Sequence, residues 1–335
     1  MAFCIGRREF ITLLGGTAAW PLAVQAQQPE RVRRIGALIG GSAENDPESR
    51  ARVAALREGF AQRGWSEGRN LRIDYRWAGT DPDRIRAFAA ELVATVPEAI
   101  FANSTPATTG VLQATRSIPI VFASVSDPVG DGIVAGFARP GGNVTGFTNV
   151  DASMGGKWLE ILKELAPAVM RVGFLFNPAT APGGGSYFLR PFEAAAPSFN
   201  VQPIATPVED VADVELALAS LAAGANGGLI VNSDAFTTRN RAAIIAAAAH
   251  HRVPAIYPFA YFVTSGGLAA YGSDATDLWR RAASYLDRIL RGEKPSELPV
   301  QAPTKFEFAI NLKTAKALGI EILPTLLARA DEVIE

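Results

Sequence analysis

The sequence has few of the residues that carry metal and redox chemistry. Its 335 residues include one cysteine, Cys4, and two histidines, the adjacent pair His250 and His251. A single cysteine excludes an internal disulfide and any site built from several thiolates. Two neighbouring histidines, without spaced ligands or a nucleophile motif, do not predict a metal centre or a catalytic triad. We therefore expect no metal, no cofactor and no catalytic residue.

Excess charge of one sign and long apolar runs are also missing. The 32 Lys and Arg residues against 33 Asp and Glu leave a formal net charge of −1, which gives no attraction to nucleic acid or anionic membranes. No later stretch is apolar over the roughly 20 residues that a membrane span needs. With 48% hydrophobic residues, the chain is long enough for about two globular domains. We expect a monomer with no nucleic-acid partner.

The N-terminal segment has the pattern of an export signal. Arg7-Arg8 precede a moderately apolar stretch that ends in the small-residue site Val24–Ala26, which is the order of a secretory signal peptide. The arginine pair resembles a twin-arginine signal. Gly6 and Thr12 depart from the usual pattern of that signal, so the general secretory route stays open. We expect cleavage of residues 1–26 and a periplasmic mature protein.

Beyond that segment, β-rich runs alternate with helical patterns. The run 34–40 precedes a helical pattern at 46–64, and the run 71–77 precedes one at 81–95. "EAIFA" then precedes "TPATTGVLQATRS", and "IPIVFA" precedes "SDPVGDGIVAGFA", with helices expected to open at Thr105-Pro106 and Asp127-Pro128. A second series of the same kind continues to residue 258. Such alternation predicts an α/β protein with two doubly wound, parallel-sheet lobes.

A glycine-rich loop, "RPGGNVTGFTN" at 139–149, lies between the two series. A phosphate-binding loop would open a helix and usually supply a lysine, whereas this one leads into a β-rich run. We interpret it as the joint between the lobes. An exported two-domain enzyme, such as a cofactor-dependent oxidoreductase, is the alternative. Its dinucleotide loop would follow the first strand, but "LIGGSAENDP" lacks the third glycine of that motif.

Polar side chains collect where the expected strands end. In an open α/β sheet, ligands bind outside the carboxyl ends of the strands, and helix N-termini there favour a carboxylate. Each such residue could instead be a helix cap, a turn residue or part of the core. The ligand-binding candidates at these ends are Ser42, Ser104, Thr105, Ser124, Ser126, Asp127, Thr148, Asn177, Asn232, Asp234 and Tyr257.

Several longer motifs resemble a known family. They are "YRWAGTDPDRI", "STPATTGVLQAT", "IPIVFASVSDPVGDGIVAGFARPGGNVTGFTN", "RVGFLFNP" and the ending "INLKTAKALGIEILPTLLARADEVIE". Together with the export signal, they resemble the periplasmic substrate-binding proteins of ABC transporters, in the tryptophan/tyrosine-binding-like branch of the type I fold. The resemblance covers nearly all of residues 32–335.

The resemblance implies a bilobed protein whose chain crosses between the lobes three times. The first lobe would comprise 32–148 and 268–296, and the second 149–267 and 297–335. It implies an extracytoplasmic solute-binding component that closes by hinge bending around a small carboxylate-bearing ligand, an amino acid or another organic acid, and docks an ABC permease in the inner membrane. Family members that bind aromatic amino acids stack them on ring side chains in the cleft. This chain offers Phe259 and Tyr271 for that role, and Tyr271 joins the listed candidates.

Overall fold

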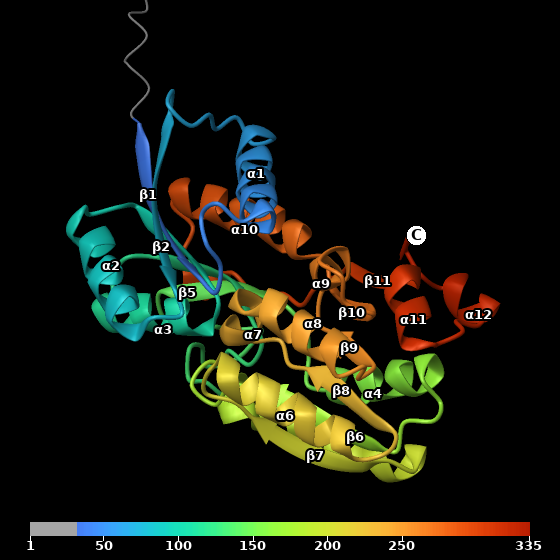
Figure 1. Ribbon diagram of the computed structural model, residues 1–335. Coiled ribbons are helices and arrows are strands. Elements are labelled where there is room, and N and C mark those ends of the chain that lie inside the picture. Colours follow the sequence, from blue (N-terminus) through green and yellow to red (C-terminus); the bar gives the residue numbers. More distant parts are fainter. Residues whose placement is uncertain (1–31) are drawn as a thin grey trace, which may run out of the picture. The chain divides into compact units, whose positions relative to one another are not determined.

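The structure is a computed structural model that describes residues 32–335 (Figure 1); the predicted signal peptide lies outside the described residues. The first lobe is built on a parallel five-stranded sheet of order β2-β1-β3-β4-β5. Its strands are β1 (Arg33–Gly40), β2 (Leu71–Gly79), β3 (Ala99–Asn103), β4 (Ile120–Val125) and β5 (Val144–Thr148).

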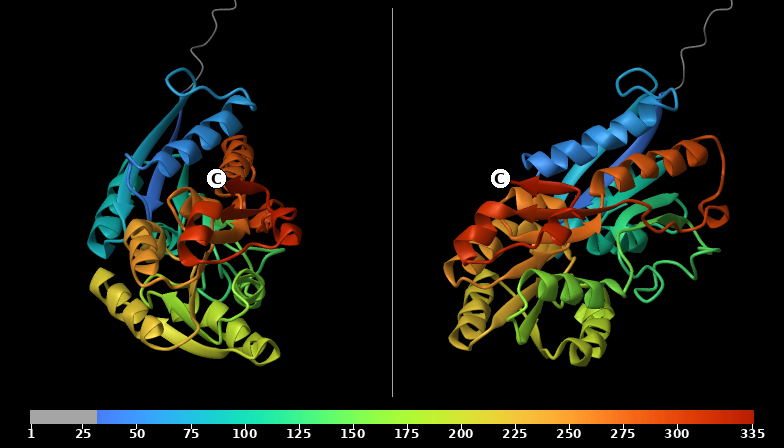
Figure 2. Two further views of the ribbon diagram at one scale, coloured as in Figure 1. Left: turned by 45° about the vertical axis from the view of Figure 1, so that its right-hand side comes forward. Right: turned by 90° about the vertical axis from the view of Figure 1, so that its right-hand side faces the viewer.

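Helices cover both faces of this sheet. Helices α1 (Pro47–Ala61) and α10 (Ala275–Leu290) pack together on one face, and α2 (Pro82–Ala94) and α3 (Thr105–Ala114) cover the other. Figure 2 shows α10 running alongside α1, although more than 200 residues separate them in sequence. The Asp-Pro openings predicted for α1 and α2 are present, because Asp46 and Asp81 accept hydrogen bonds from the first-turn N–H groups.

The second lobe has a seven-stranded sheet of order β12-β11-β10-β9-β8-β6-β7. Its strands are β6 (Arg171–Phe176), β7 (Gln202–Pro207), β8 (Gly227–Val231), β9 (Ala255–Tyr257), β10 (Ala269–Ser273), β11 (Phe306–Asn311) and β12 (Glu332–Ile334). All neighbours are parallel except β10 and β11.

Helices also sandwich the second sheet. One face packs against α4 (Met154–Leu165), α5 (Ser186–Ala195), α11 (Leu312–Leu318) and α12 (Pro324–Leu327). The other packs against α6 (Val211–Ala223), α7 (Ala235–Arg239), α8 (Arg241–His250) and α9 (Ala260–Thr264). The predicted class, two doubly wound α/β lobes, is therefore confirmed.

The chain passes between the lobes three times. It leaves β5 for α4, and it returns from β10 to α10. After α10, residues 298–301 run beside β5, where the Thr148 N–H donates to the Gln301 carbonyl at 2.9 Å, and the chain then enters β11. Three neighbouring crossings can bend together, as a hinge requires.

Four local predictions are wrong. The glycine-rich loop at 139–149 is not the joint between the lobes, because it leads into β5 of the first sheet and the chain crosses only after Thr148. Residues 297–301 were assigned to the second lobe, but Leu298 packs in the core of the first lobe and Gln301 pairs with β5.

The other two wrong predictions concern the segment 268–274 and the stretch after Asp127. The segment 268–274 was assigned to the first lobe, but β10 pairs with β9 and β11 in the second sheet, so the chain crosses only at Asp274, the N-cap of α10. Residues 128–137 form turns instead of a helix after Asp127. Three glycines in that stretch, one of them Gly132 with φ of 68°, disfavour a helix there.

Candidate ligand-binding site

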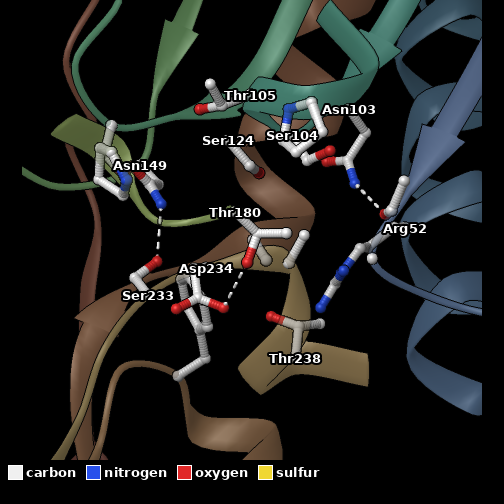
Figure 3. Close-up of a pocket in the computed structure, with 18 of the residues that line it drawn as sticks. Arg52, Asn103, Ser104, Thr105, Ser124, Asn149, Thr180, Ser233, Asp234 and Thr238 are labelled. Carbon is white, nitrogen blue, oxygen red and sulfur yellow. Dashed lines mark hydrogen bonds between the residues drawn. The ribbon is translucent and has the colours of Figure 1, made fainter. Parts of the chain in front are cut away.

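A pocket lies between the lobes, at the carboxyl ends of strands from both sheets (Figure 3). Its empty space is about 500 Å³, with open solvent at the mouth included. The walls are mostly hydroxyl and amide side chains, which the strand-to-helix turns present to the space between the lobes. Only two lining side chains carry a charge: Arg52 in α1 of the first lobe and Asp234 before α7 of the second.

Five of the twelve predicted ligand-binding residues line this pocket. They are Ser104, Thr105, Ser124, Ser126 and Asp234. The first four come from the ends of β3 and β4, and Asp234 comes from the turn after β8. Selecting residues at strand ends therefore identified pocket residues in both lobes, although those of the first lobe are more than 100 positions from Asp234 in the sequence.

Two further predicted residues lie behind Asp234 instead of lining the pocket. The Asn177 N–H donates to Asp234 Oδ2 at 3.2 Å, and Asn232 Nδ2 donates to the same oxygen at 3.3 Å. Asn177 Nδ2 also donates to the Val208 carbonyl at 2.9 Å. Both asparagines are buried, and they orient the carboxylate.

The other five predicted residues lie outside the pocket lining. Ser42 is buried beyond the end of β1, and Thr148 Oγ1 lies 3.4 Å from the Gln301 carbonyl oxygen beside β5. Asp127 accepts from the Gly130 N–H at 2.8 Å, as a turn residue does. Tyr257 is a core residue, 1% exposed and stacked on Phe262. Tyr271 stacks on Phe306, at a ring-centroid distance of 5.9 Å.

Asp234 is held in place by protein donors. Its Oδ1 accepts from the Thr237 N–H at 2.8 Å and from Thr180 Oγ1 at 3.2 Å, and a capping box joins it to the first turn of α7. Burial raises the pKa of Asp234 to about 6, although these hydrogen bonds act in the opposite direction. The charge of this pocket wall therefore changes within the physiological pH range.

Arg52 is the pocket's cation, and it is 5% exposed. Its Nε is buried without a hydrogen-bond partner within residues 32–335. The guanidinium carbon lies 4.7 Å from the ring centroid of Tyr261, which belongs to the second lobe. A ring face stabilises a cation only in part. Arg52 has no ion-pair partner within residues 32–335, although its charge and that of Asp46 act on each other over a longer distance. A buried guanidinium without an ion-pair partner attracts an anion, so this end of the pocket suits a negatively charged group.

The start of α3 supplies more donors at the same pocket. Ser104 precedes the helix without capping it, and its Oγ is buried without a partner in the described part of the chain. Thr105 and Pro106 follow as the first helical residues and also line the pocket. An uncapped helix N-terminus has free N–H groups and a positive dipole end.

Two of the six non-glycine residues with positive φ among residues 32–335 lie in this wall. Ser104 has φ 84° and ψ 156°, and Ser124 has φ 60°. Conformations of this kind are rare outside glycine and cost on the order of 1–3 kcal/mol each. Both serines end strands of the same sheet and line the pocket. The fold therefore holds two strained residues at the site.

Among the lining residues that the sequence prediction missed, four polar ones lie away from the strand ends. Arg52, Thr180, Thr238 and Tyr261 lie in helices or in a loop and not directly at strand ends. Arg52 alone left a signal, because it shares the apolar face of its helix with Val53, Leu56 and Phe60. An arginine on the buried face of a helix is costly unless its charge is compensated, so its position indicates an ion-pair partner or a ligand.

Two doubly wound lobes, three crossings and one polar pocket between the lobes define the class of bilobed solute-binding proteins. The family model for "ABC transporter substrate binding protein" matches residues 45–334. The chain belongs to this family.

Individual relatives agree. A tyrosine-binding protein of Clostridioides difficile is 28% identical over 264 residues, which are 78% of this chain and 74% of the relative. A conserved domain protein of Vibrio cholerae, whose crystal structure is known, is 27% identical with a TM-score of 0.83, over 90% of this chain and all of that one. A Streptococcus pneumonia ABC domain solved in complex with L-Trp has the same TM-score and the same coverage at 24% identity.

These comparisons bear on several predictions. The resemblance to ABC substrate-binding proteins is confirmed. The family binds substrates and is not enzymatic, so the prediction of a non-enzyme is confirmed. The alternative, an exported oxidoreductase, is wrong. No helix within residues 32–335 is long and apolar enough to cross a membrane.

Proposed function

We propose that this chain is the exported solute-binding component of an ABC importer and that its ligand is an amino acid with an aromatic side chain. One observation carries the choice of a zwitterionic ligand: the pocket is lined by one buried cation and one buried acid, from opposite lobes. A zwitterion complements this pair, and both lobes must meet before it can be bound at both ends.

The carboxylate of the ligand would bind on the first lobe. Arg52 offers a buried guanidinium there whose Nε has no partner within residues 32–335, and Thr105 adds its N–H and its hydroxyl at the start of α3. Charge-assisted hydrogen bonds of this type are roughly twice as strong as neutral ones. The strained Ser104, with its unpaired Oγ, supplies another donor.

The ammonium group would face Asp234 on the second lobe. Asp234 already accepts four hydrogen bonds from protein donors, so its contribution is the negative charge in a desolvated wall. Apolar surface comes from Phe259 and Tyr261, which line the pocket and stack with ring centroids 5.3 Å apart. Binding of aromatic amino acids by relatives supports this assignment.

Ligand binding would shift the lobes toward the closed form. A ligand can favour one form only through contacts that it makes in that form alone. Arg52 and Asp234 belong to different lobes, so a zwitterion contacts both only when the lobes are closed. The closed form then docks the permease. Export of the chain by its N-terminal signal would place it in the periplasm, where such docking occurs.

A thermal-shift screen of the purified protein tests this function. We expect L-tyrosine or L-tryptophan to raise the melting temperature, whereas tryptamine and indole, which lack the carboxylate, should have little effect, because ligands that bind only the folded state stabilise it. Stabilisation by tryptamine equal to that by L-tryptophan would contradict the proposal. Stabilisation only by amino acids without rings would leave the proposed importer role standing and would show that the proposed aromatic ligand is wrong.

A further inference from the structure

A second contact joins the two lobes outside the pocket. Arg241, the first residue of α8 in the second lobe, donates to both carboxylate oxygens of Asp46 in the first lobe, from Nη1 at 2.7 Å and from Nη2 at 2.8 Å. The two side chains are only 16% and 11% exposed. Neither residue lines the pocket, so the ion pair does not contact the ligand directly, although the charge of Asp46 acts on the pocket residue Arg52.

Asp46 connects the ion pair to the ligand site. It is the N-cap of α1 and accepts from the Glu48 N–H at 3.1 Å, and α1 carries Arg52. Burial alone would raise the pKa of Asp46, but the hydrogen bonds from Arg241 and from the Glu48 N–H lower it below its usual value. Asp46 is thus ionised at neutral pH, and the pair is fully charged.

Tyr261 provides a second connection. Its ring centroid lies 4.7 Å from the guanidinium carbon of Arg52 and 5.6 Å from that of Arg241. One ring of the second lobe therefore contacts both the pocket arginine and the arginine of the ion pair. Separation of the lobes would break the Arg52 contact and the ion pair together.

Two glycines of the first lobe, Gly41 and Gly79, allow the second lobe to lie close to it. Gly41 has φ 74°, and a Cβ there would lie 3.3 Å from the Cα of Ala235 in α7. At Gly79 a Cβ would lie 2.5 Å from Nη1 of Arg239. Glycine at both positions lets the α7 segment of the second lobe lie directly on the ends of β1 and β2.

We propose that Asp46 and Arg241 form a latch that holds the lobes closed and so sets how long the ligand stays bound, while the pocket residues choose the ligand. The inference rests on the proposed function only for the probe ligand. A bidentate arginine–carboxylate pair has the geometry that makes ion pairs most effective. Because it forms only between the lobes, it favours the closed form alone.

The latch is tested by measuring lobe closure directly. Cys4 is the only cysteine in the sequence, so the variant Cys4→Ser accepts dyes only at introduced positions. Arg116→Cys and Leu216→Cys place one exposed label on each lobe. Energy transfer between the dyes then reports the closed fraction, and stopped-flow mixing with L-tyrosine or L-tryptophan reports the rate constants.

Two single variants and their combination break the latch. Asp46→Asn removes the charge but keeps a good N-cap for α1, and Arg241→Gln removes the other partner. We expect each to raise the dissociation rate constant by roughly tenfold with little change in association, since changes at a partly buried ion pair act mainly on dissociation. The double variant should be no worse than the worse single one. Arg280→Gln is the matched control, because Arg280 pairs with Glu58 at 3.0 Å within the first lobe.

Unchanged dissociation in both single variants, or additive effects in the double variant, would overturn the latch. The proposed ligand is a separate question. If neither amino acid binds the parent protein, the proposed ligand is wrong, and the latch is still judged without ligand. A lower closed fraction in Asp46→Asn than in Arg280→Gln supports the latch, and equal closed fractions refute it.

Discussion

Replacing Arg52 by methionine should make the ligand-free protein more stable while it weakens binding. Arg52 is 5% exposed, and its Nε has no partner in the described chain. The effective cost of burying an unpaired ion is several kcal/mol, and the contact with the Tyr261 ring offsets about 0.5–2 kcal/mol of it. Methionine has a similar length and no charge. This burial cost is present when the lobes are closed, so we expect Arg52→Met to raise the free energy of unfolding of the ligand-free protein by up to about 1–2 kcal/mol, and by less as the lobes open.

The same change should reduce affinity strongly. Hydrogen bonds to a charged group are worth about 1.5–3 kcal/mol each. With about 3 kcal/mol lost at the ligand carboxylate, Kd should increase roughly a hundredfold. The loss should be confined to ligands with a carboxylate. L-tryptophan and tryptamine should differ greatly in affinity for the parent protein and little for the variant.

Two assays measure these opposite effects. Urea denaturation of the ligand-free protein gives the change in stability, and isothermal titration calorimetry with L-tryptophan and tryptamine gives the change in affinity. Arg57→Met is the control, since Arg57 lies on the same helix, is exposed and pairs with Glu67 at 2.7 Å. If Arg52→Met lowers stability and leaves the affinity for L-tryptophan intact, Arg52 is a structural residue and the reasoning fails.

Three further predictions concern the pocket and export. Thr105→Val should weaken binding by roughly ten- to a hundredfold with little change in unfolding, because one hydrogen bond to a charged ligand is lost; calorimetry measures this, and unchanged affinity would make the hydroxyl merely structural. Because burial raises the pKa of Asp234 to about 6, the side chain is ionised above that value. Affinity for a zwitterion should therefore fall as pH decreases from neutral to about 5, and Asp234→Asn should abolish this dependence. Replacing both Arg7 and Arg8 by lysine should block export by the twin-arginine route, and N-terminal sequencing of the exported parent should begin near Gln27; unaltered export would indicate the general secretory route.

The sequence predicts the lobes well because the alternation of strands and helices is a local property. It does not determine which sheet a strand joins at a crossing. The strand-helix alternation in the sequence is the same whether β10 stays in the second sheet or returns to the first. Only its pairing with β9 and β11 shows that it belongs to the second sheet. Glycines after Asp127 gave a weak signal against the expected helix.

The pocket was predictable only in part, for a related reason. The carboxyl end of a strand is visible in the sequence, so Ser104, Thr105 and Asp234 could be selected. The direction of each side chain depends on packing, which turned Asn177 behind the pocket wall. Arg52 reaches the pocket from within a helix and meets Tyr261 only where the lobes close on each other. Contacts of that kind have no local pattern.

A crystal structure of the protein grown with L-tyrosine or L-tryptophan tests the central claim most directly. The account predicts the ligand between the lobes, with its carboxylate hydrogen-bonded to the Arg52 guanidinium and to the Thr105 N–H, its ammonium group toward Asp234, and its ring toward Phe259 and Tyr261. A ligand bound in the reverse orientation, with Arg52 still unpaired, would contradict it, as would density for the amino acid anywhere other than this pocket.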